Sequence, residues 1–129
     1  MADIKESLMY SNGHLWVKKL TGLNVMIGIS DHAQEDLGDI VFIDIPKMGT
    51  EVIRGKEAGA IESVKTVSPL RAPISGKIVE RNVAAKRNPK LINSSPYEKG
   101  WLYVVEVRDM TEVGSLMSAK KYREFLENQ

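Results

Sequence analysis

The chain has 129 residues, a formal net charge of +1 and a hydrophobic fraction of 43%, which is typical of one globular domain. The sequence has no apolar run long enough to span a membrane, no signal peptide, no cysteine and only two histidines. These features exclude disulfides and thiol catalysis, argue against a zinc site, and suit a cytoplasmic location. The near-neutral charge makes nucleic acid a poor partner, and we expect residues 1–129 to form a single domain.

The N-terminal part predicts a hairpin followed by a short helix. Residues 14–20 and 25–29 are rich in β-branched and aromatic side chains and flank a turn, which is typical of two paired strands. In residues 31–37, Asp31 and Gln34 resemble a capping box, and a glycine follows where a helix C-cap belongs. We therefore expect two helical turns after the second strand.

The middle of the chain predicts strands joined by tight turns. Residues 39–45 form an almost continuous apolar run, which predicts a strand buried on both faces, and residues 50–53 predict another short strand. Residues 58–62 and 66–72 flank a tight turn and predict a second hairpin with Lys65 near its tip. Small residues in its first arm suggest close backbone approach to a neighbour, and the proline in its second arm belongs on a sheet edge.

The C-terminal part predicts two more strands and one helix. Residues 77–83 alternate as a half-buried strand, residues 84–100 are turn-rich with one short helical turn, and residues 101–107 predict the last strand. Ser118 is placed to cap a helix over residues 119–126. Many short strands with little helix favour a compact β-sandwich or flattened barrel.

Charge is unevenly distributed along the chain. Residues 31–45 carry five acids and no Lys or Arg, whereas residues 72–100 carry six bases and two acids, a net charge of +4. These stretches are either solvated faces or a docking surface for a partner of opposite sign. No nucleophile–base pair is evident, and His32 is better explained as a surface or capping residue than as a base, so we do not expect an enzyme.

Several motifs follow one another in order from about residue 8 to the end of the chain: His14–Val17, Gly28–Gln34, Leu37–Val41, Glu62–Lys65, Pro73–Gly76, and Leu91–Tyr97 with Gly100–Trp101. Together they resemble the H proteins of the glycine cleavage system. The resemblance implies a mainly β fold, the lipoyl-domain-like barrel-sandwich hybrid, with short helices and a C-terminal helix.

The same resemblance assigns a cofactor to the second hairpin. It implies that Lys65 receives lipoic acid in amide linkage, and that the non-catalytic chain presents this group as a swinging arm to partner enzymes. The biotinyl relatives place methionine on both sides of their lysine, so Val64 and Thr66 favour lipoate. We expect Glu62 to help the attaching enzyme recognise the hairpin, with a solvated strand acid as the alternative.

Three positions depart from the family's pattern. The family usually supplies a serine and two acids that shelter the charged amine of a methylamine cargo, and this chain has Gly13, Leu15 and Pro69 there. These replacements favour a different cargo, as in the lipoate-binding proteins that serve a heterodisulfide-reductase-like complex in sulfur oxidation. The alternative is an H protein that shuttles methylamine from glycine decarboxylase to aminomethyltransferase. A second alternative is a structural module without lipoate.

The expected partners follow from these interpretations. They are lipoate-attaching enzymes, dihydrolipoamide dehydrogenase, and either the heterodisulfide-reductase-like complex or the glycine cleavage enzymes. We expect a monomer that binds no metal, no nucleic acid and no membrane.

Overall fold

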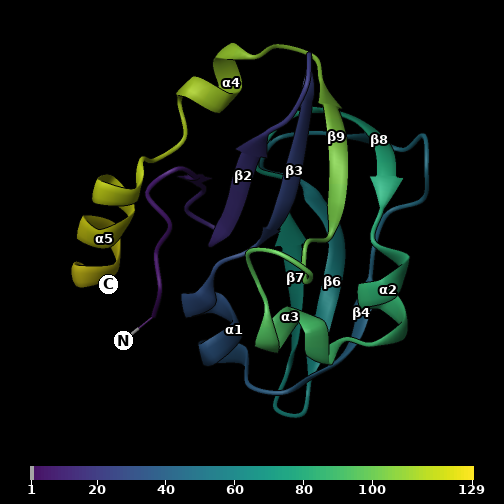
Figure 1. Ribbon diagram of the computed structural model, residues 1–129, viewed down its shortest axis with the longest axis vertical. Coiled ribbons are helices and arrows are strands. Elements are labelled where there is room, and N and C mark those ends of the chain that lie inside the picture. The colour runs from purple at the N-terminus through teal and green to yellow at the C-terminus, as the bar shows by residue number, and fades with distance from the viewer. Residues whose placement is uncertain (1) are drawn as a thin grey trace.

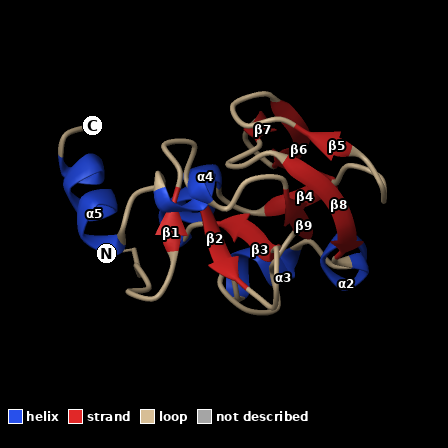
Figure 2. Ribbon diagram, turned by 90° about the horizontal axis from the view of Figure 1, so that it is seen from above, coloured by secondary structure: helices blue, strands red, loops and turns tan. Residues whose placement is uncertain are grey.

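The computed structural model describes residues 2–129 as two antiparallel sheets with five short helices (Figures 1 and 2). The larger sheet has the strand order β1-β2-β3-β9-β8-β5, and the smaller sheet has the order β4-β6-β7. The strands are β1 (Met9–Tyr10), β2 (Leu15–Lys19), β3 (Asn24–Ile29), β4 (Ile40–Asp44), β5 (Glu51–Val52), β6 (Glu57–Ser63), β7 (Val67–Arg71), β8 (Gly76–Arg81) and β9 (Tyr103–Val107). The helices are α1 (Asp31–Leu37), α2 (Val83–Arg87), α3 (Lys90–Ser94), α4 (Thr111–Gly114) and α5 (Ala119–Glu127). This mainly β architecture confirms the predicted fold class.

The main hydrophobic core combines buried side chains from the two sheets. Ile27, Ile78 and Val105 come from the larger sheet, Ile43 and Ile61 come from the smaller one, and all five are at most 1% exposed. Burial of such side chains is the main favourable term in folding, at about 25 cal/mol per Å² of apolar surface. The core therefore gives the strands of both sheets fixed positions.

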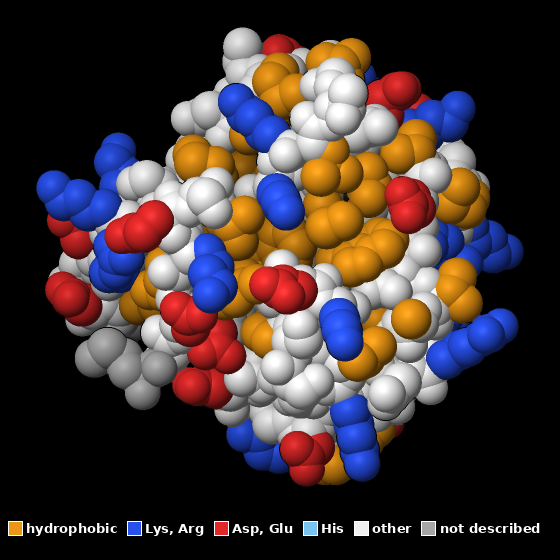
Figure 3. All heavy atoms as spheres, in the orientation of Figure 1, with side chains coloured by type: hydrophobic (Ala, Val, Ile, Leu, Met, Phe, Trp, Pro, Cys, Tyr) orange, Lys and Arg blue, Asp and Glu red, His pale blue; other side chains and the backbone are white. Residues whose placement is uncertain are grey.

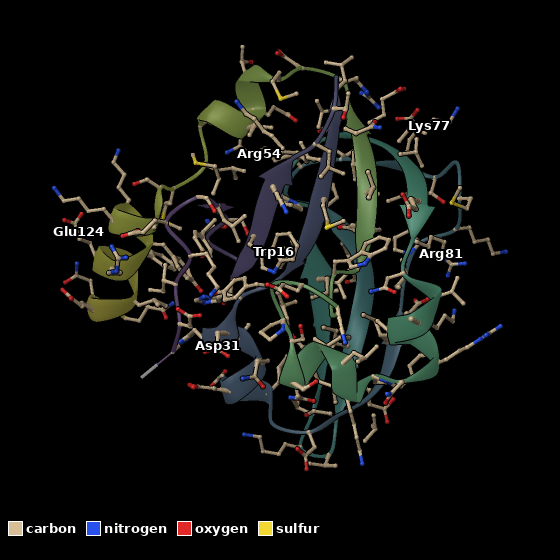
Figure 4. The ribbon with its side chains drawn as sticks, in the orientation of Figure 1. Trp16, Asp31, Arg54, Lys77, Arg81 and Glu124 are labelled. Atoms are coloured by element: carbon tan, nitrogen blue, oxygen red, sulfur yellow. The ribbon has the colours of Figure 1, made fainter. Side chains whose placement is uncertain are left out.

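A second cluster attaches the C-terminal helix to the larger sheet. The rings of Tyr10 and Tyr122 stack at 4.4 Å between centroids, with an interplanar angle of 2°. Trp16 is fully buried at the middle of the view in Figure 4, and its indole N–H donates to the carbonyl oxygen of Pro96 at 3.0 Å. Figure 3 shows hydrophobic side chains gathered at the centre of this face, with charged side chains around them. The face of α5 that carries Tyr122 is therefore packed against the larger sheet.

The structure confirms the bounds predicted for α1 but corrects its cap. Ser30 is the N-cap residue, because its backbone is extended and its hydroxyl accepts the Ala33 N–H at 3.1 Å. Asp31 is the first helical residue instead, and its carboxylate accepts a hydrogen bond from the Gln34 amide at 2.8 Å. Gly38 is the C-cap, as predicted, with φ of 79°.

The prediction that β4 is buried on both faces was wrong. Val41 and Phe42 are 51% and 53% exposed. A register shift between Ile40 and Phe42 lets two successive side chains face solvent, which a regular strand does not allow. The close approach predicted in the first hairpin arm is confirmed, because a Cβ on Gly59 would lie 2.3 Å from the Asp44 carbonyl oxygen.

Strand β1 and helix α2 were not predicted. Strand β1 has only two residues and pairs through Tyr10 with Trp16, so it leaves little periodic signal in the sequence. Helix α2 lies in the stretch predicted as turns, and the Asn82 side chain caps it by accepting the Ala85 N–H at 3.2 Å. Across residues 2–129, no helix is long and apolar enough to cross a membrane.

Candidate functional site

The β6–β7 hairpin ends in a two-residue loop that carries Lys65. Glu62 pairs with Val67 across the hairpin, and the Ser63 N–H donates to the carbonyl oxygen of Thr66 at 2.8 Å. Val64 and Lys65 therefore form the loop, which projects at the lower end of the molecule beyond α1 and α3 (Figure 1). The predicted hairpin with Lys65 near its tip is confirmed.

A buried serine hydroxyl fixes the shape of this loop. Ser63 is 5% exposed, and its Oγ accepts the N–H groups of Lys65 at 3.1 Å and Thr66 at 3.2 Å. Neither loop residue has positive φ, so the turn is not the primed type that glycine and asparagine favour in hairpins. The side chain of Ser63 satisfies main-chain donors that such a loop would otherwise leave to water.

The Lys65 side chain extends from the hairpin to the end of α1. Its ammonium group donates to the carbonyl oxygen of Asp36 at 2.8 Å, and the Val64 N–H donates to the Asp39 oxygen at 3.0 Å. The stem passes over Gly38, where an added Cβ would lie 3.2 Å from Lys65 Cε. Lys65 is exposed and forms no ion pair within residues 2–129, so its ammonium group is accessible from solvent.

Asn93 on α3 holds the segment over which the Lys65 stem lies. Its amide donates to the oxygens of Gly38 and Gln34, each at 2.9 Å, and its own oxygen accepts the Ile40 N–H at 2.9 Å. One side chain thus links α3, α1 and the start of β4 beneath the hairpin tip. Asn93 was not predicted as a site residue, although it lies within one of the motifs that carry the family resemblance.

Glu62 lies on the exposed face of the smaller sheet. It pairs with Phe42 on one side and with Val67 on the other, and both neighbours are more than half exposed. The described residues give the Glu62 carboxylate no hydrogen bond and no ion pair. An acid between two exposed apolar side chains suits contact with another protein, and the role of Glu62 in recognition stays a prediction.

The two histidines lie together at the base of α5. Their ring centroids are 5.0 Å apart, and His14 Nδ1 lies 2.8 Å from the Tyr122 hydroxyl oxygen. The pKa of His14 is lowered, first by burial and then by repulsion from His32. The Tyr122 hydroxyl also lies 2.7 Å from Ser30 Oγ, and burial raises the pKa of Tyr122 to about 12. This network is structural, because it joins α5 to the cap of α1.

The comparison with family models decides the family. The model described as "Glycine cleavage H-protein" matches residues 8–129. The chain belongs to this family.

Individual relatives agree with this assignment. A glycine cleavage system H protein of Halalkalibacterium halodurans is 49% identical over 129 residues, covering 100% of both chains. The H protein of Geobacillus sp. (strain WCH70) is 50% identical over 121 residues, covering 94% of each chain. The crystal structure of a glycine cleavage system H protein from Mycobacterium marinum matches with a TM-score of 0.87 at 39% identity, covering 96% of this chain and 99% of that one.

Membership of this family has two consequences for the predictions. Glycine cleavage H proteins carry lipoic acid covalently on a lysine, so the predicted cofactor is that of the family. These relatives are glycine cleavage proteins, which favours the glycine cleavage alternative over the sulfur-oxidation interpretation that we placed first.

The three departures from the family pattern lie in different surroundings. Gly13 is exposed on the rim of a cavity near β1, Leu15 is 1% exposed within the main core, and Pro69 is exposed on β7 opposite Ala60. None of the three can supply a side-chain carboxylate or hydroxyl. The side chains at these three positions therefore cannot accept a hydrogen bond from a buried ammonium group.

Proposed function

We propose that this chain is a lipoyl carrier of the glycine cleavage system, with lipoate attached to Lys65. In this role the chain moves a methylamine group from glycine decarboxylase to aminomethyltransferase. The observation that carries the proposal is the position of Lys65, an exposed lysine at the tip of a rigid hairpin, in a chain that matches the H-protein family over residues 8–129.

The surroundings of Lys65 fit an amide-linked group. For attachment, the Lys65 amine, in its neutral form, attacks the activated carboxyl carbon of lipoate, a C–N bond forms, and the activating group leaves with the bonding electrons. The amine loses a proton in this step, and the amide keeps one N–H that can still donate to the Asp36 oxygen. When attached, lipoate supplies a dithiolane that carries a group or a pair of electrons between enzymes.

The scaffold contributes position rather than chemistry. The Ser63 hydroxyl and the link through Asn93 fix the base of the arm, while the arm itself is free to move between partners. Tethering a reactive group to a docked protein raises its effective concentration at the partner's active site to the millimolar range for short flexible linkers. Within residues 2–129 no group of three or more His, Cys, Asp or Glu side chains is placed to hold a metal ion.

Partners and location follow from this role as proposals. The lipoate-attaching enzymes would contact Lys65 and Glu62, and dihydrolipoamide dehydrogenase would reoxidise the arm. A single domain, a monomeric state and a cytoplasmic location remain predictions from the sequence.

Intact mass spectrometry tests the attachment. The chain produced in cells supplied with lipoate should gain the mass of one lipoyl group, and peptide mapping should place it on Lys65. The Lys65→Arg variant should gain none, while Lys77→Arg, at another exposed lysine, should be modified normally. A modified Lys65→Arg protein, or an unmodified wild-type chain, would overturn the assignment and favour the structural module.

A reconstitution tests the pathway. The lipoylated chain with glycine decarboxylase, aminomethyltransferase and dihydrolipoamide dehydrogenase should support glycine decarboxylation at ordinary H-protein rates. The residues Gly13, Leu15 and Pro69 support a second candidate, a carrier for sulfur oxidation, because they provide no acceptor for an amine. Failure of glycine turnover, together with reduction of the arm by a heterodisulfide-reductase-like complex, would favour that candidate.

A further inference from the structure

A cavity of about 500 Å³ lies where β7 ends, at the opposite end of this strand from the hairpin tip that carries Lys65. Four segments line it: the end of β1, the loop between β5 and β6, the end of β7, and the link from α4 to α5. Its lining residues are Tyr10, Ser11, Asn12, Gly13, Arg54, Gly55, Arg71, Ala72, Pro73, Ser115, Leu116 and Met117. This volume lies in the usual range for a site that binds a small molecule.

The charge in this cavity has one sign. Arg54 and Arg71 are its only charged lining residues, and the described lining contains no Asp, Glu or Lys. Neither guanidinium group forms an ion pair within residues 2–129, whereas Arg108 pairs with Glu51 and Arg123 with Glu6. Two unpaired guanidinium groups on one concave surface attract an anion.

The two arginines are held in place by neutral oxygens. Arg54 donates through Nη1 to the Ser115 hydroxyl at 2.7 Å, near α4 in Figure 4, and Arg71 donates through Nη1 to the Gly55 oxygen at 3.2 Å. Each guanidinium has five N–H donors, so most of its donors remain for a ligand. A planar fork that is already positioned loses little entropy when it binds a carboxylate or phosphate.

The main chain around Arg54 is fixed as well. The Arg54 N–H donates to Ser75 Oγ at 2.9 Å, and the Glu112 carboxylate accepts hydrogen bonds from the Ser75 N–H at 2.7 Å and the Ser75 hydroxyl at 3.3 Å. The Gly55 N–H donates to the Ala72 oxygen at 2.8 Å. Glu112 is therefore engaged outside the cavity, and the loop that presents Arg54 is anchored to the end of β7.

The rest of the lining is mixed: Ser11, Asn12 and Ser115 are polar, whereas Tyr10, Ala72, Pro73, Leu116 and Met117 are apolar. Tyr10, Ala72 and Leu116 are at most 9% exposed, and paired main-chain hydrogen bonds of 2.8 Å between Tyr10 and Met117 join two of the walls. An apolar wall beside two cations suits a ligand with an anionic head and an apolar body. Glu57 is an acid that could compete with the ligand, because it stands opposite Arg71 across the strand pair, but it forms no ion pair with Arg71.

We propose that this cavity binds the oxyanion group of a small organic acid, a carboxylate or a phosphate, between Arg54 and Arg71. The apolar body of the ligand lies against Pro73 and Leu116. All of its lining comes from the chain itself, so we expect the unmodified chain to bind the ligand.

Titrations followed by amide chemical shifts test this site on the full chain, with and without lipoate. The probes are phenyl phosphate, benzoate and inorganic phosphate, with benzyl alcohol as the uncharged probe. We expect shifts at Gly13, Gly55 and Leu116, with phenyl phosphate or benzoate bound more tightly than inorganic phosphate. If phenyl phosphate binds more tightly than benzoate, the head group of the ligand is a phosphate. The opposite order identifies a carboxylate. Benzyl alcohol should leave these amides unshifted.

Matched variants assign the binding to the two arginines. Arg54→Gln and Arg71→Gln should each weaken binding about tenfold, the effect of losing one charge-assisted hydrogen bond, and Arg108→Gln should leave it unchanged. Glu57→Gln should tighten binding, because it removes the competing acid. Thermal unfolding confirms that each variant is folded. The proposal is wrong if no probe shifts the cavity amides, or if folded Arg54→Gln and Arg71→Gln bind as tightly as the wild type.

Discussion

The Lys65 ammonium group donates a hydrogen bond to the main-chain oxygen of Asp36 at 2.8 Å and so ties the hairpin tip to the last turn of α1. A cation near the C-terminal carbonyls of a helix is favourable, although exposed contacts of this kind are weak. Conversion of the amine to an amide removes the charge, so the attached arm is held less firmly than the free lysine.

Loosening of the hairpin tip is therefore expected when Lys65 loses its charge. In Lys65→Gln, the amide proton of Val64, which is bonded to the Asp39 oxygen at 3.0 Å, should exchange faster than in the wild type. The free energy of unfolding should change by less than about 1 kcal/mol, since the contact is exposed. Hydrogen exchange read by NMR checks this, with Lys77→Gln as control. Unchanged exchange at Val64 would show that the lysine does not restrain the loop.

Loss of the Ser63 hydroxyl should affect both stability and modification. Ser63→Ala removes the acceptor for the Lys65 and Thr66 N–H groups, and we expect a loss of about 1–2 kcal/mol from two hydrogen bonds. Lipoylation followed by intact mass over time should slow, because the loop no longer holds one shape. Thr66→Val, which removes only a weak contact at 3.4 Å, should be nearly neutral. Equal modification rates in Ser63→Ala and Thr66→Val would contradict the positioning role.

The support beneath the hairpin can be tested at Asn93. Asn93→Ala deletes three hydrogen bonds to α1 and the start of β4, which corresponds to about 2–4 kcal/mol. Urea unfolding should show this loss, and the amide of Gly38 should shift in NMR spectra. Ser94→Ala, at the exposed neighbouring position, should stay within about 0.5 kcal/mol of the wild type. Similar stabilities for the two variants would show that Asn93 does not hold this segment.

Local chemistry explains which elements the sequence predicted well. The hairpin at Lys65 and the helix α1 depend on β-branched runs, turn residues and a glycine C-cap, all of which are contiguous in the chain. The exposure of Phe42 arises from a register shift against β6, and only the pairing of two distant strands shows it. Such shifts leave no periodic trace in a single sequence.

The same distinction applies to the candidate site. Lys65 and Glu62 stood out because they lie in one motif, whereas the contribution of Asn93 comes from contacts across 53, 55 and 59 residues of sequence separation. The cavity at Arg54 and Arg71 likewise combines four separate segments. Lys65 could therefore be proposed as the attachment point from the sequence, whereas the contacts that support the hairpin depend on the folded chain.

Close packing of β6 against β4 should make Gly59 irreplaceable. A Cβ there would lie 2.3 Å from the Asp44 oxygen, and φ is +90°, so Gly59→Ala combines a main-chain clash with backbone strain. We expect it to lower stability by at least about 3 kcal/mol or to prevent folding. Gly49→Ala has φ of +82° but no atom within 4 Å, and should cost only about 1–2 kcal/mol. Equal losses in the two variants would mean that strain alone acts at Gly59.

The stability of the chain should fall in mild acid because of His14. Burial and the adjacent His32 hold the pKa of His14 below its ordinary value of 6.5, with Asp36 opposing the shift. The unfolded chain therefore takes up the proton first as the pH falls. The stabilisation by neutral His14 is complete above the unfolded pKa and is lost as the pH falls from 6.5 toward the lowered folded pKa.

The histidine contribution can be isolated by unfolding the protein in urea between about pH 8 and about pH 5.5, where most carboxyl groups remain ionised. The wild type should lose stability across this range, and His14→Gln, which has no titrating ring beside the Tyr122 hydroxyl, should lose much less. His32→Gln should reduce the dependence of the unfolding free energy on pH by a smaller amount. This variant removes only the repulsion from His32, which is the second cause of the lowered His14 pKa. If the unfolding free energy of His14→Gln depends on pH as steeply as that of the wild type, other groups cause the acid sensitivity.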